Sequence, residues 1–417
     1  MQRSMVGSRE RDGRSRCWID ASRGFRFRRA AAAIAVVSGA ALTLAGGAGC
    51  VGSAGGGGGA MGGDGARPPA PRALAEYGDP VVRSVLRERA LETLERAARS
   101  ETALLRANAI EALQLAPSRA EPFVMDGLSD ENSGVRFVAA MTAGRLKLRR
   151  AASFLDQLRV DGDARVRMAA IYGLDRLGVE VNPSPVGAGL RDASLSVRTQ
   201  AAFVLGELGD ATAAPMLREA SARSAPGERR GPRAALEAAL MRLQIAEALI
   251  KLGEDDVESV LRSALHPGTR DEVEAAVLAT QIIGELRIES ATSQLVGLIE
   301  ETVPGSGESV DVRRRSYLWP LELRLAAALA LTKMNELGGV FVADLAFDHP
   351  DPAVRSQAAF VYGYAARSID LAKLELLTRD ANPLVTVAAS AGVLRALERS
   401  DGEAGAGAGA GAGVGAE

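Results

Sequence analysis

A ten-residue pattern that recurs along the chain constrains its fold more than any other feature. The segments 197–206 and 354–363 carry the same residue at eight of their ten positions. Weaker copies begin at Val135 and Val166, and degenerate copies place Arg106, Arg242 and Arg324 at the second position of the pattern. Two more copies, within 275–286 and 384–394, lack the arginine. Internal repetition of this kind predicts an array of similar, stacked structural units.

The spacing of the copies fixes the size of one unit. Arg106, Arg136, Arg167 and Arg198 are separated by 30, 31 and 31 residues. At a rise of about 1.5 Å per residue, this length fits two short helices and two turns. Asp, Asn, Gly and Pro fall between the apolar stretches, where they begin and end helices. The sequence therefore predicts an all-α fold, an α-solenoid (superhelix) of about nine short helix pairs over residues 80–397, with insertions at 221–233 and 302–320.

At these residues the chain resembles the HEAT-repeat family, and the short spacing is similar to the HEAT-like repeats of the bilin-lyase type. An aspartate stands six residues before the arginine of the second helix in three successive copies. In that family the pair ties successive turns into a ladder, so the resemblance implies a structural role, with each arginine contacting the turn before its helix. The residues concerned are Asp130, Arg136, Asp161, Arg167, Asp192, Arg198 and Arg355.

The first fifty residues have the layout of an export signal. Arginines precede the uncharged apolar run from Ala30 to Ala45, and small residues then lead to Cys50. This ending resembles a bacterial lipoprotein signal, which implies lipid on Cys50 and a chain that is exported and anchored to a membrane on its periplasmic or extracytoplasmic side. Gly47 stands where that family usually has leucine, so a retained membrane anchor and ordinary cleavage after a small residue remain alternatives.

The predicted solenoid is flanked by segments that are too poor in large apolar residues to fold. Residues 51–79 form a Gly- and Pro-rich linker, and residues 398–417 predict a disordered tail rich in Gly and Ala. Residues 1–50 hold nine arginines against three acidic residues, which leaves 41 basic and 49 acidic residues and a formal charge of −8 for the remainder. That balance gives no basic footprint for nucleic acid.

None of the common catalytic or cofactor-binding motifs occurs in the sequence, so no cofactor is expected. The two cysteines, Cys17 and Cys50, lie in the export segment, which excludes a thiolate metal site after residue 50. His266 and His349 each precede a proline at a loop between predicted helices. HEAT-like enzymes that hydroxylate a lysine-derived residue bind iron through His-Glu pairs, and this sequence has no such pair.

A stripe of large apolar residues follows the outward face of the repeated helix. With the motif valine counted as position 0, positions 0, 4, 8 and 11 face the core at 100° per residue, and positions 2, 6 and 10 lie opposite. This stripe predicts a binding surface on the concave side, although neighbouring helices could instead bury these side chains against each other. Its candidate binding residues are Phe137, Met141, Met168, Tyr172, Phe203, Phe360 and Tyr364.

The insertion at 302–320 is the second candidate contact site. Its nineteen residues lack helical periodicity, and long loops of this kind are often functional. Its end joins three cations to two aromatic residues, in the types enriched at binding hot spots: Arg313, Arg314, Arg315, Tyr317 and Trp319. The alternative is that Tyr317 and Trp319 staple the loop to the next helix while the arginines are solvated.

These features together predict a non-catalytic protein-protein interaction scaffold, tethered to a membrane outside the cytoplasm, that binds a protein or peptide. An enzyme or enzyme subunit, of lyase type or with a carboxylate or metal site, is the rival from another class. A protein that binds envelope polysaccharide is a third possibility. A tight cluster of buried acids around a metal or pocket would favour the enzyme, and exposed aromatic residues along a groove would favour the polysaccharide.

Overall fold

The computed structural model describes residues 72–223, 231–303, 309 and 311–410, all within one compact unit. Eighteen α-helices and several short 3-10 helices make up the regular structure of these residues. The one β-bridge among them joins Thr302 to Tyr317. The predicted all-α solenoid of about nine helix pairs is therefore confirmed. The predicted signal, Cys50 and most of the 51–79 linker lie outside the described residues.

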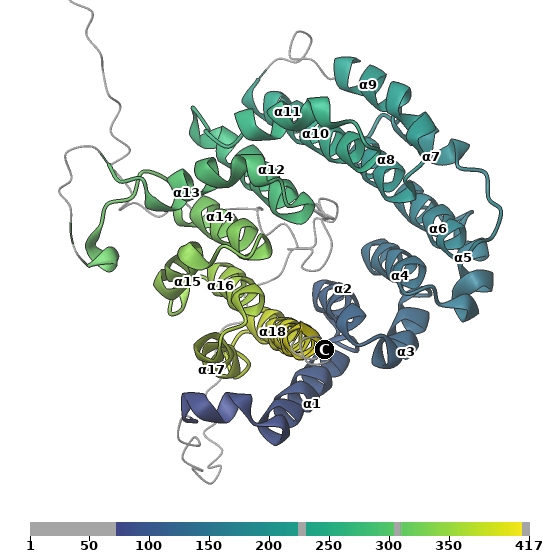
Figure 1. Cartoon of the computed structure of the whole chain (residues 1–417). Helices are drawn as coiled ribbons and strands as arrows, with labels where there is room; N and C mark the ends of the chain where they lie inside the picture. The colour runs from purple at the N-terminus through teal and green to yellow at the C-terminus, as the bar shows by residue number, and fades with distance from the viewer. Residues whose placement is uncertain (1–71, 224–230, 304–308, 310, 411–417) are drawn as a thin grey trace, which may run out of the picture. The chain divides into compact units, whose positions relative to one another are not determined.

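The helices alternate between a first and a second helix of each pair (Figure 1). The first helices are α1 (Pro80–Ala97), α3 (Pro117–Gly127), α5 (Ala152–Leu158), α7 (Ser184–Gly189), α9 (Ala214–Arg223), α11 (Glu258–Ser263), α13 (Thr292–Glu300), α15 (Val340–Ala346) and α17 (Ser368–Leu377). The second helices are α2 (Ala103–Ala112), α4 (Ser133–Arg145), α6 (Ala164–Arg176), α8 (Leu195–Leu208), α10 (Pro232–Lys251), α12 (Val273–Leu286), α14 (Leu321–Lys333), α16 (Pro352–Ala365) and α18 (Pro383–Ala410). The 3-10 helices are η1 (Leu74–Gly78), η2 (Leu113–Leu115), η3 (Arg149–Ala151), η4 (Ala211–Ala213), η6 (Asp255–Val257), η7 (Arg270–Glu272), η8 (Glu289–Ala291), η9 (Val312–Arg314) and η10 (Leu337–Gly339).

Polar residues in the turns set where the second helices begin. The side chain of Asn132 accepts hydrogen bonds from two backbone N–H groups at the start of α4. Asp163 and Asp351 each accept one such hydrogen bond at the starts of α6 and α16. Pro352 and Pro383 occupy the first positions of α16 and α18, where a missing N–H costs nothing. These local choices agree with the repeat spacing, so the sequence places most helix starts correctly.

The second helices pack on one another in sequence order and carry most of the core. Every residue of α4 from 134 to 144 is buried except Arg136. A helix that is buried on every face must contact neighbours on all sides. Small residues make this possible, because alanine and glycine occupy many of the positions between the larger side chains.

Glycine brings alternate pairs of second helices into close contact. A Cβ atom placed on position 9 of one helix would lie 2.7–2.9 Å from the Cα of position 7 on the next, at Gly144 and Gly173, Gly206 and Ala248, Gly284 and Ala330, and Gly363 and Gly392. The junctions between these four doublets have larger residues at the same two positions, as in Asp175 of α6 and Val204 of α8. The first helix pair, α1–α2, stands outside the doublets, and Gln114 just after it donates a hydrogen bond to Thr142 of α4. The array is thus built from doublets of helix pairs, with a period twice that of the sequence repeat.

The last repeat packs against the first. Helix α18 contacts both α1 and α2, and α17 contacts η1, so the array has no free end within the described residues (Figure 1). Terminal repeats of a solenoid usually act as caps with a polar outer face. They do cap the array, but each does so by covering the other.

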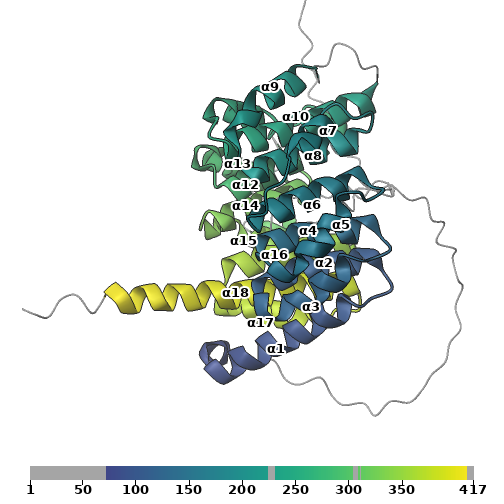
Figure 2. The ribbon, with the colours of Figure 1, turned by 90° about the vertical axis from the view of Figure 1, so that its right-hand side faces the viewer.

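Both predicted boundaries of the repeat region need correction. The ordered chain begins before residue 80, because η1 packs against α17 and Tyr77 is only 3% exposed. Helix α18 continues to Ala410 instead of giving way to a disordered tail at 398, and Figure 2 shows its last turns projecting beyond the other helices. The insertion at 221–233 is shorter than predicted, since α9 runs to Arg223 and α10 begins at Pro232.

No helix of the described residues combines the length and apolar character needed to cross a membrane.

The glycine contacts predict that a Gly→Ala substitution, which normally stabilises a helix, will destabilise this protein. Gly363→Ala should raise helix propensity by about 1 kcal/mol, yet its methyl group meets the backbone of Gly392, and such overpacking costs roughly 1–3 kcal/mol. We expect a lower melting temperature in thermal denaturation followed by circular dichroism. Gly162→Ala is the control, because nothing lies within 4 Å of a Cβ at that position. A stabilised Gly363→Ala protein would contradict the close approach.

Candidate functional site

The predicted ladder arginines anchor the turn that precedes each second helix. In each copy a guanidinium Nη1 donates to the backbone carbonyl six residues earlier, over 2.6–2.9 Å: Arg106 to Ser100, Arg136 to Asp130, Arg167 to Asp161, Arg198 to Asp192 and Arg355 to His349. These contacts bring each ladder arginine to the turn before its own helix. Their contacts hold the backbone of the turn, which is a structural role.

The carboxylates of the ladder bind the arginine of the preceding repeat. Asp130 accepts two hydrogen bonds of 2.7 Å from Arg106 of the preceding repeat, and Asp161 accepts from Arg136 at 2.8 and 3.0 Å. Each carboxylate also accepts the backbone N–H two residues later, which shapes its own turn. The ladder thus runs between repeats, with the backbone contact inside each repeat.

The ladder is modified at two places. Arg167 makes the carbonyl contacts but no ion pair with Asp192, so the carboxylate link of the first repeats stops there. Arg324 lies at the matching place in α14 and has a tyrosine in place of a carboxylate. Its guanidinium carbon lies 3.3 Å from the centre of the Tyr317 ring, and it donates to the carbonyl of Ile299. Burial lowers the pKa of Arg324 to about 10, an effect that Tyr317 only partly offsets.

The apolar stripe belongs to the interior, which corrects the prediction of a binding surface. Its members Phe137, Met141, Met168, Tyr172, Phe203 and Phe360 are 2–5% exposed. The physical reason is the closeness of the second helices, which lets a side chain at position 2 or 6 lie against the neighbouring helix. Phe203, for example, has the Lys251 ammonium of α10 5.3 Å from its ring centre. Tyr364 is half-buried and is the member that remains partly accessible.

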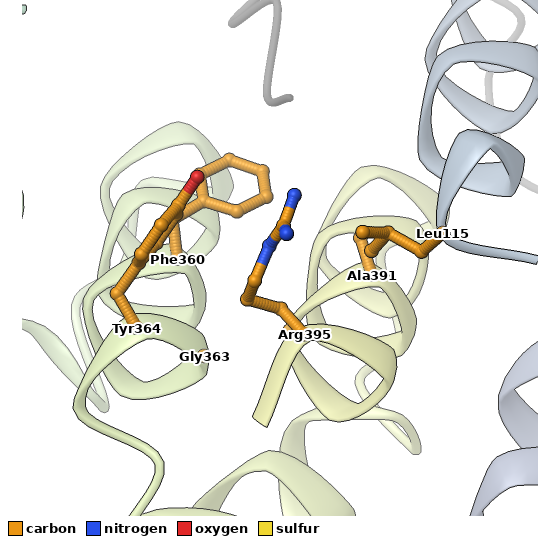
Figure 3. Close-up of a pocket in the computed structure, with 7 residues that line it drawn as sticks. Leu115, Phe360, Gly363, Tyr364, Ala391 and Arg395 are labelled. Carbon is orange, nitrogen blue, oxygen red and sulfur yellow. The ribbon is translucent and has the colours of Figure 1, made fainter. Parts of the chain in front are cut away.

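Tyr364 lies among cations at the carboxyl-terminal ends of the second helices. The charged groups of Lys333, Arg395 and Arg399 lie 5.2, 5.3 and 6.0 Å from the centre of its ring. Figure 3 shows the Arg395 guanidinium between the side chains of Tyr364 and Leu115. The cavity beside them, of about 10 Å³, has room for no more than a water molecule. This cluster can attract an anion but cannot enclose a small-molecule substrate.

A second polar cluster links α4, α8 and α10 at the same level. Lys251 binds Glu207 at 2.7 Å and Glu247 at 2.6 Å, and Arg145 binds Glu207 at 3.2 Å. Burial would raise the pKa of Glu207, but Lys251 and Arg145 outweigh it and lower that pKa. Burial raises the pKa of Glu247, whose side chain is 1% exposed. Both acids already have a cation as partner, so the cluster is a closed ion-pair network.

Sequence reasoning missed this network, although a signal for it exists. Position 10 of the repeat is charged in most copies, with Arg145, Glu207, Lys251, Glu285 and Lys333 among them. Parallel second helices bring these positions to one level, where Lys333 also pairs with Glu285. The row of charged residues is visible in the sequence only when the degenerate copies are placed in register with the better ones.

The 302–320 insertion is held to the array by its two aromatic residues. Backbone hydrogen bonds join Val303 to Ser316 and Leu318 to Glu301, and the Trp319 indole donates to Glu301 at 2.9 Å. Trp319 also lies edge-on to His266, with ring centres 6.1 Å apart. Tyr317 and Trp319 are half-buried and act as the staple considered above.

The arginines of the same insertion point outward. Arg313, Arg314 and Arg315 are exposed on and beside η9. Arg315 donates to the carbonyl of Ser309, and Arg314 lies 3.4 Å from Asp311. Stapled aromatic residues thus present three adjacent cations to solvent.

Side chains that could ligate a metal are scattered over residues 72–223, 231–303 and 311–410. No three His, Cys, Asp or Glu side chains in these ranges lie close enough to hold a metal ion. A larger hollow, of about 430 Å³, opens beside the Arg355–Asp380 pair and is lined by His349 and Leu376. His349 accepts the backbone N–H of Asp351 there, which is the role of a turn residue.

Comparison with known families identifies the repeats. The sequence profile of HEAT repeats matches residues 91–175 and again residues 154–239. The chain therefore contains HEAT repeats, and its all-α solenoid is the fold of that repeat class. No curated protein matches the chain.

Solved structures similar to this one are distant from it in sequence. The YibA protein of Escherichia coli is 15% identical, with 79% of this chain and 98% of that chain covered and a TM-score of 0.28. Human deoxyhypusine hydroxylase in complex with glycerol is 17% identical, with 78% and 99% covered and a TM-score of 0.31. The complex of CpcE and CpcF of phycocyanin lyase from a Nostoc species is 18% identical, with 67% and 93% covered and a TM-score of 0.30.

The ladder predicts an acid-sensitive contribution to stability. Arg355 holds Asp380 through two hydrogen bonds of 2.8 Å, and this contact lowers the pKa of Asp380. A lowered carboxyl pKa stabilises the fold above the ordinary value of about 4, and the contribution disappears as the pH falls through the folded-state pKa. Asp380→Asn should therefore lose about 1.5–3 kcal/mol at neutral pH, measured by urea denaturation. The difference in the free energy of unfolding between this variant and the wild type should shrink in acid. A difference that stays constant from pH 7 to about pH 3 would refute the prediction.

Proposed function

We propose that this protein is a non-catalytic scaffold, tethered to a membrane outside the cytoplasm, that binds an acidic segment of a protein partner. The observation that carries the proposal is the row of exposed arginines Arg313, Arg314 and Arg315 on a loop fixed by Tyr317 and Trp319. A fixed loop loses little entropy when a partner binds, and arginine is the cation best suited to carboxylates.

The contact site differs from the concave stripe that the sequence favoured. The stripe residues are buried, so the proposal moves the contact to the insertion and to the cationic surroundings of Tyr364. Both places join positive charge to an aromatic ring. Both therefore fit an acidic peptide that carries apolar side chains.

The rival enzyme function has one observation in its favour, the buried acids Glu207 and Glu247. They lie beside the same lysine, and Glu207 is also bound by Arg145. A general acid or base needs access to a substrate, and Glu247 is 1% exposed. The ion-pair network therefore supports a structural role for these acids more than a catalytic one.

The arginine loop gives the sharpest test of the proposal. A variant with Arg313, Arg314 and Arg315 changed to Ser should lose most of the partner that the wild-type chain retains from detergent-solubilised membranes. Its melting temperature should stay nearly unchanged, because exposed ion pairs contribute only about 0–1 kcal/mol. A triple Ser variant at Arg149, Arg150 and Arg159, which are also exposed, is the matched control and should bind normally.

Trp319→Ala separates the staple from the contact. Removing the indole should lower the melting temperature, since its packing on His266 and its hydrogen bond to Glu301 are lost. Binding should fall as well, because the arginines lose their fixed position. A less stable Trp319→Ala protein together with normal partner retention in the triple Arg variant would leave only a structural staple.

The tether is tested at Cys50. Radiolabelled palmitate should enter the wild-type chain and be absent from Cys50→Ser, because the lipid attaches to the cysteine that follows the cleavage site. Cys17→Ser is the control and should label like the wild type. Equal labelling of Cys50→Ser would exclude the lipoprotein tether and leave a retained anchor or plain cleavage.

A further inference from the structure

The contact between the first and last repeats depends on two clusters of charge. In the first, Arg83 of α1 donates to the Leu397 carbonyl at 3.1 Å, to the Ser400 hydroxyl at 2.7 Å and to Asp401 of α18. Arg87, one turn further along α1, binds the other oxygen of Asp401 at 2.8 Å. One exposed carboxylate therefore joins two arginines across the α1–α18 seam.

Glu375 of α17 is the centre of the second cluster. It accepts a hydrogen bond of 2.9 Å from the Tyr77 hydroxyl, and Arg72 and Arg89 lie 3.4 and 3.9 Å from its oxygens. Burial and the hydrogen bond to Glu375 raise the pKa of Tyr77 to about 12, so the phenol remains a donor at neutral pH. Residues 298 to 318 positions apart in sequence thus meet at this seam.

The seam differs in chemistry from the contact between α16 and α18. Seven of the eighteen residues of α1 are charged, whereas α16 has a single charged residue among fourteen. Helix α1 has no glycine and so lacks the backbone approach that joins α16 to α18 at Gly363. The buried apolar residues of α1 are Leu86, Ala90, Leu91 and Leu94, and Val82 and Ala97 also pack against the core.

These differences make the seam sensitive to salt. Ion pairs at partly exposed sites are screened by salt and contribute little each, whereas the buried contacts between second helices are not screened. In a solenoid each repeat is stabilised mainly by its neighbours, so the other junctions do not depend on the seam.

We propose that the α1–α18 seam is an ionic clasp, at which the closed array opens and recloses while the repeats between remain folded. Opening uncovers the apolar faces of α1 and α18 and separates Arg72 from Glu375. Because charge holds the seam closed, the equilibrium between its open and closed forms depends on ionic strength and on the carboxylates of Glu375 and Asp401.

The clasp is tested by hydrogen exchange on the full chain in non-ionic detergent, with a Glu375→Gln, Asp401→Asn variant. Exchange in residues 80–97 and 383–401 should become about tenfold faster than in wild type, while α6 to α12 stay unchanged. The matched control is Glu254→Gln with Asp256→Asn, which removes the two carboxylates bound by Arg218 elsewhere in the array. The control should leave the seam helices as in wild type.

A second measurement needs no substitution. Raising the salt from about 0.05 M to about 0.5 M should accelerate exchange in the same two segments of the wild type and have a smaller effect on the double variant. Unchanged exchange in the seam helices under both treatments would overturn the proposal. Equal acceleration in every helix would also overturn it, since the two carboxylates would then only support global stability.

Discussion

The close approach of neighbouring second helices is the constraint on which the rest of the structure depends. It requires glycine or alanine where one helix crosses the next, as Gly363 meets Gly392 and Gly284 meets Ala330. Helices this close bury each other on several faces, which explains an array rich in alanine and poor in large aromatic residues. The same closeness places the aromatic residues of the repeat between helices, so they contribute packing energy and leave little apolar surface for a partner.

Charge fills the places that apolar packing leaves at the helix ends. At the amino-terminal ends, the ladder arginines bind turn carbonyls and the carboxylate of the following repeat, as in Arg136 with Asp130 and Asp161. At the carboxyl-terminal ends, cations such as Lys333 of α14 and Arg145 of α4 also complement the helix dipole. Buried acids are tolerated there because a cation accompanies each, and the network around Lys251 is the clearest case. The sites left for function are therefore the exposed cations at the edges and on the insertion.

Much of this architecture could be predicted from the sequence, because the repeat spacing and the capping residues are local signals. The ladder shows where local reasoning ends: Asp130 stands six residues before Arg136, but its carboxylate binds Arg106 of the repeat before. Both spacings are present in the sequence, and only the stacking of turns decides between them. The burial of Phe137 and Phe203 follows from how close the next helix lies, and closure of the array follows from the accumulated rotation between repeats. The distance between helices and the rotation between repeats cannot be read from the sequence of a single repeat.

The doublet period limits how such an array can change in length. Loss of the single helix pair α5–α6 would set Gly144 of α4 opposite Val204 of α8, where a branched side chain occupies the space that the backbone needs. Loss of two consecutive pairs, α5 to α8, would set Gly144 opposite Ala248, which already packs against a glycine in the present array. Arrays of this design can therefore be shortened or extended by duplication and deletion in units of two helix pairs, close to sixty residues, with each glycine still meeting a small neighbour.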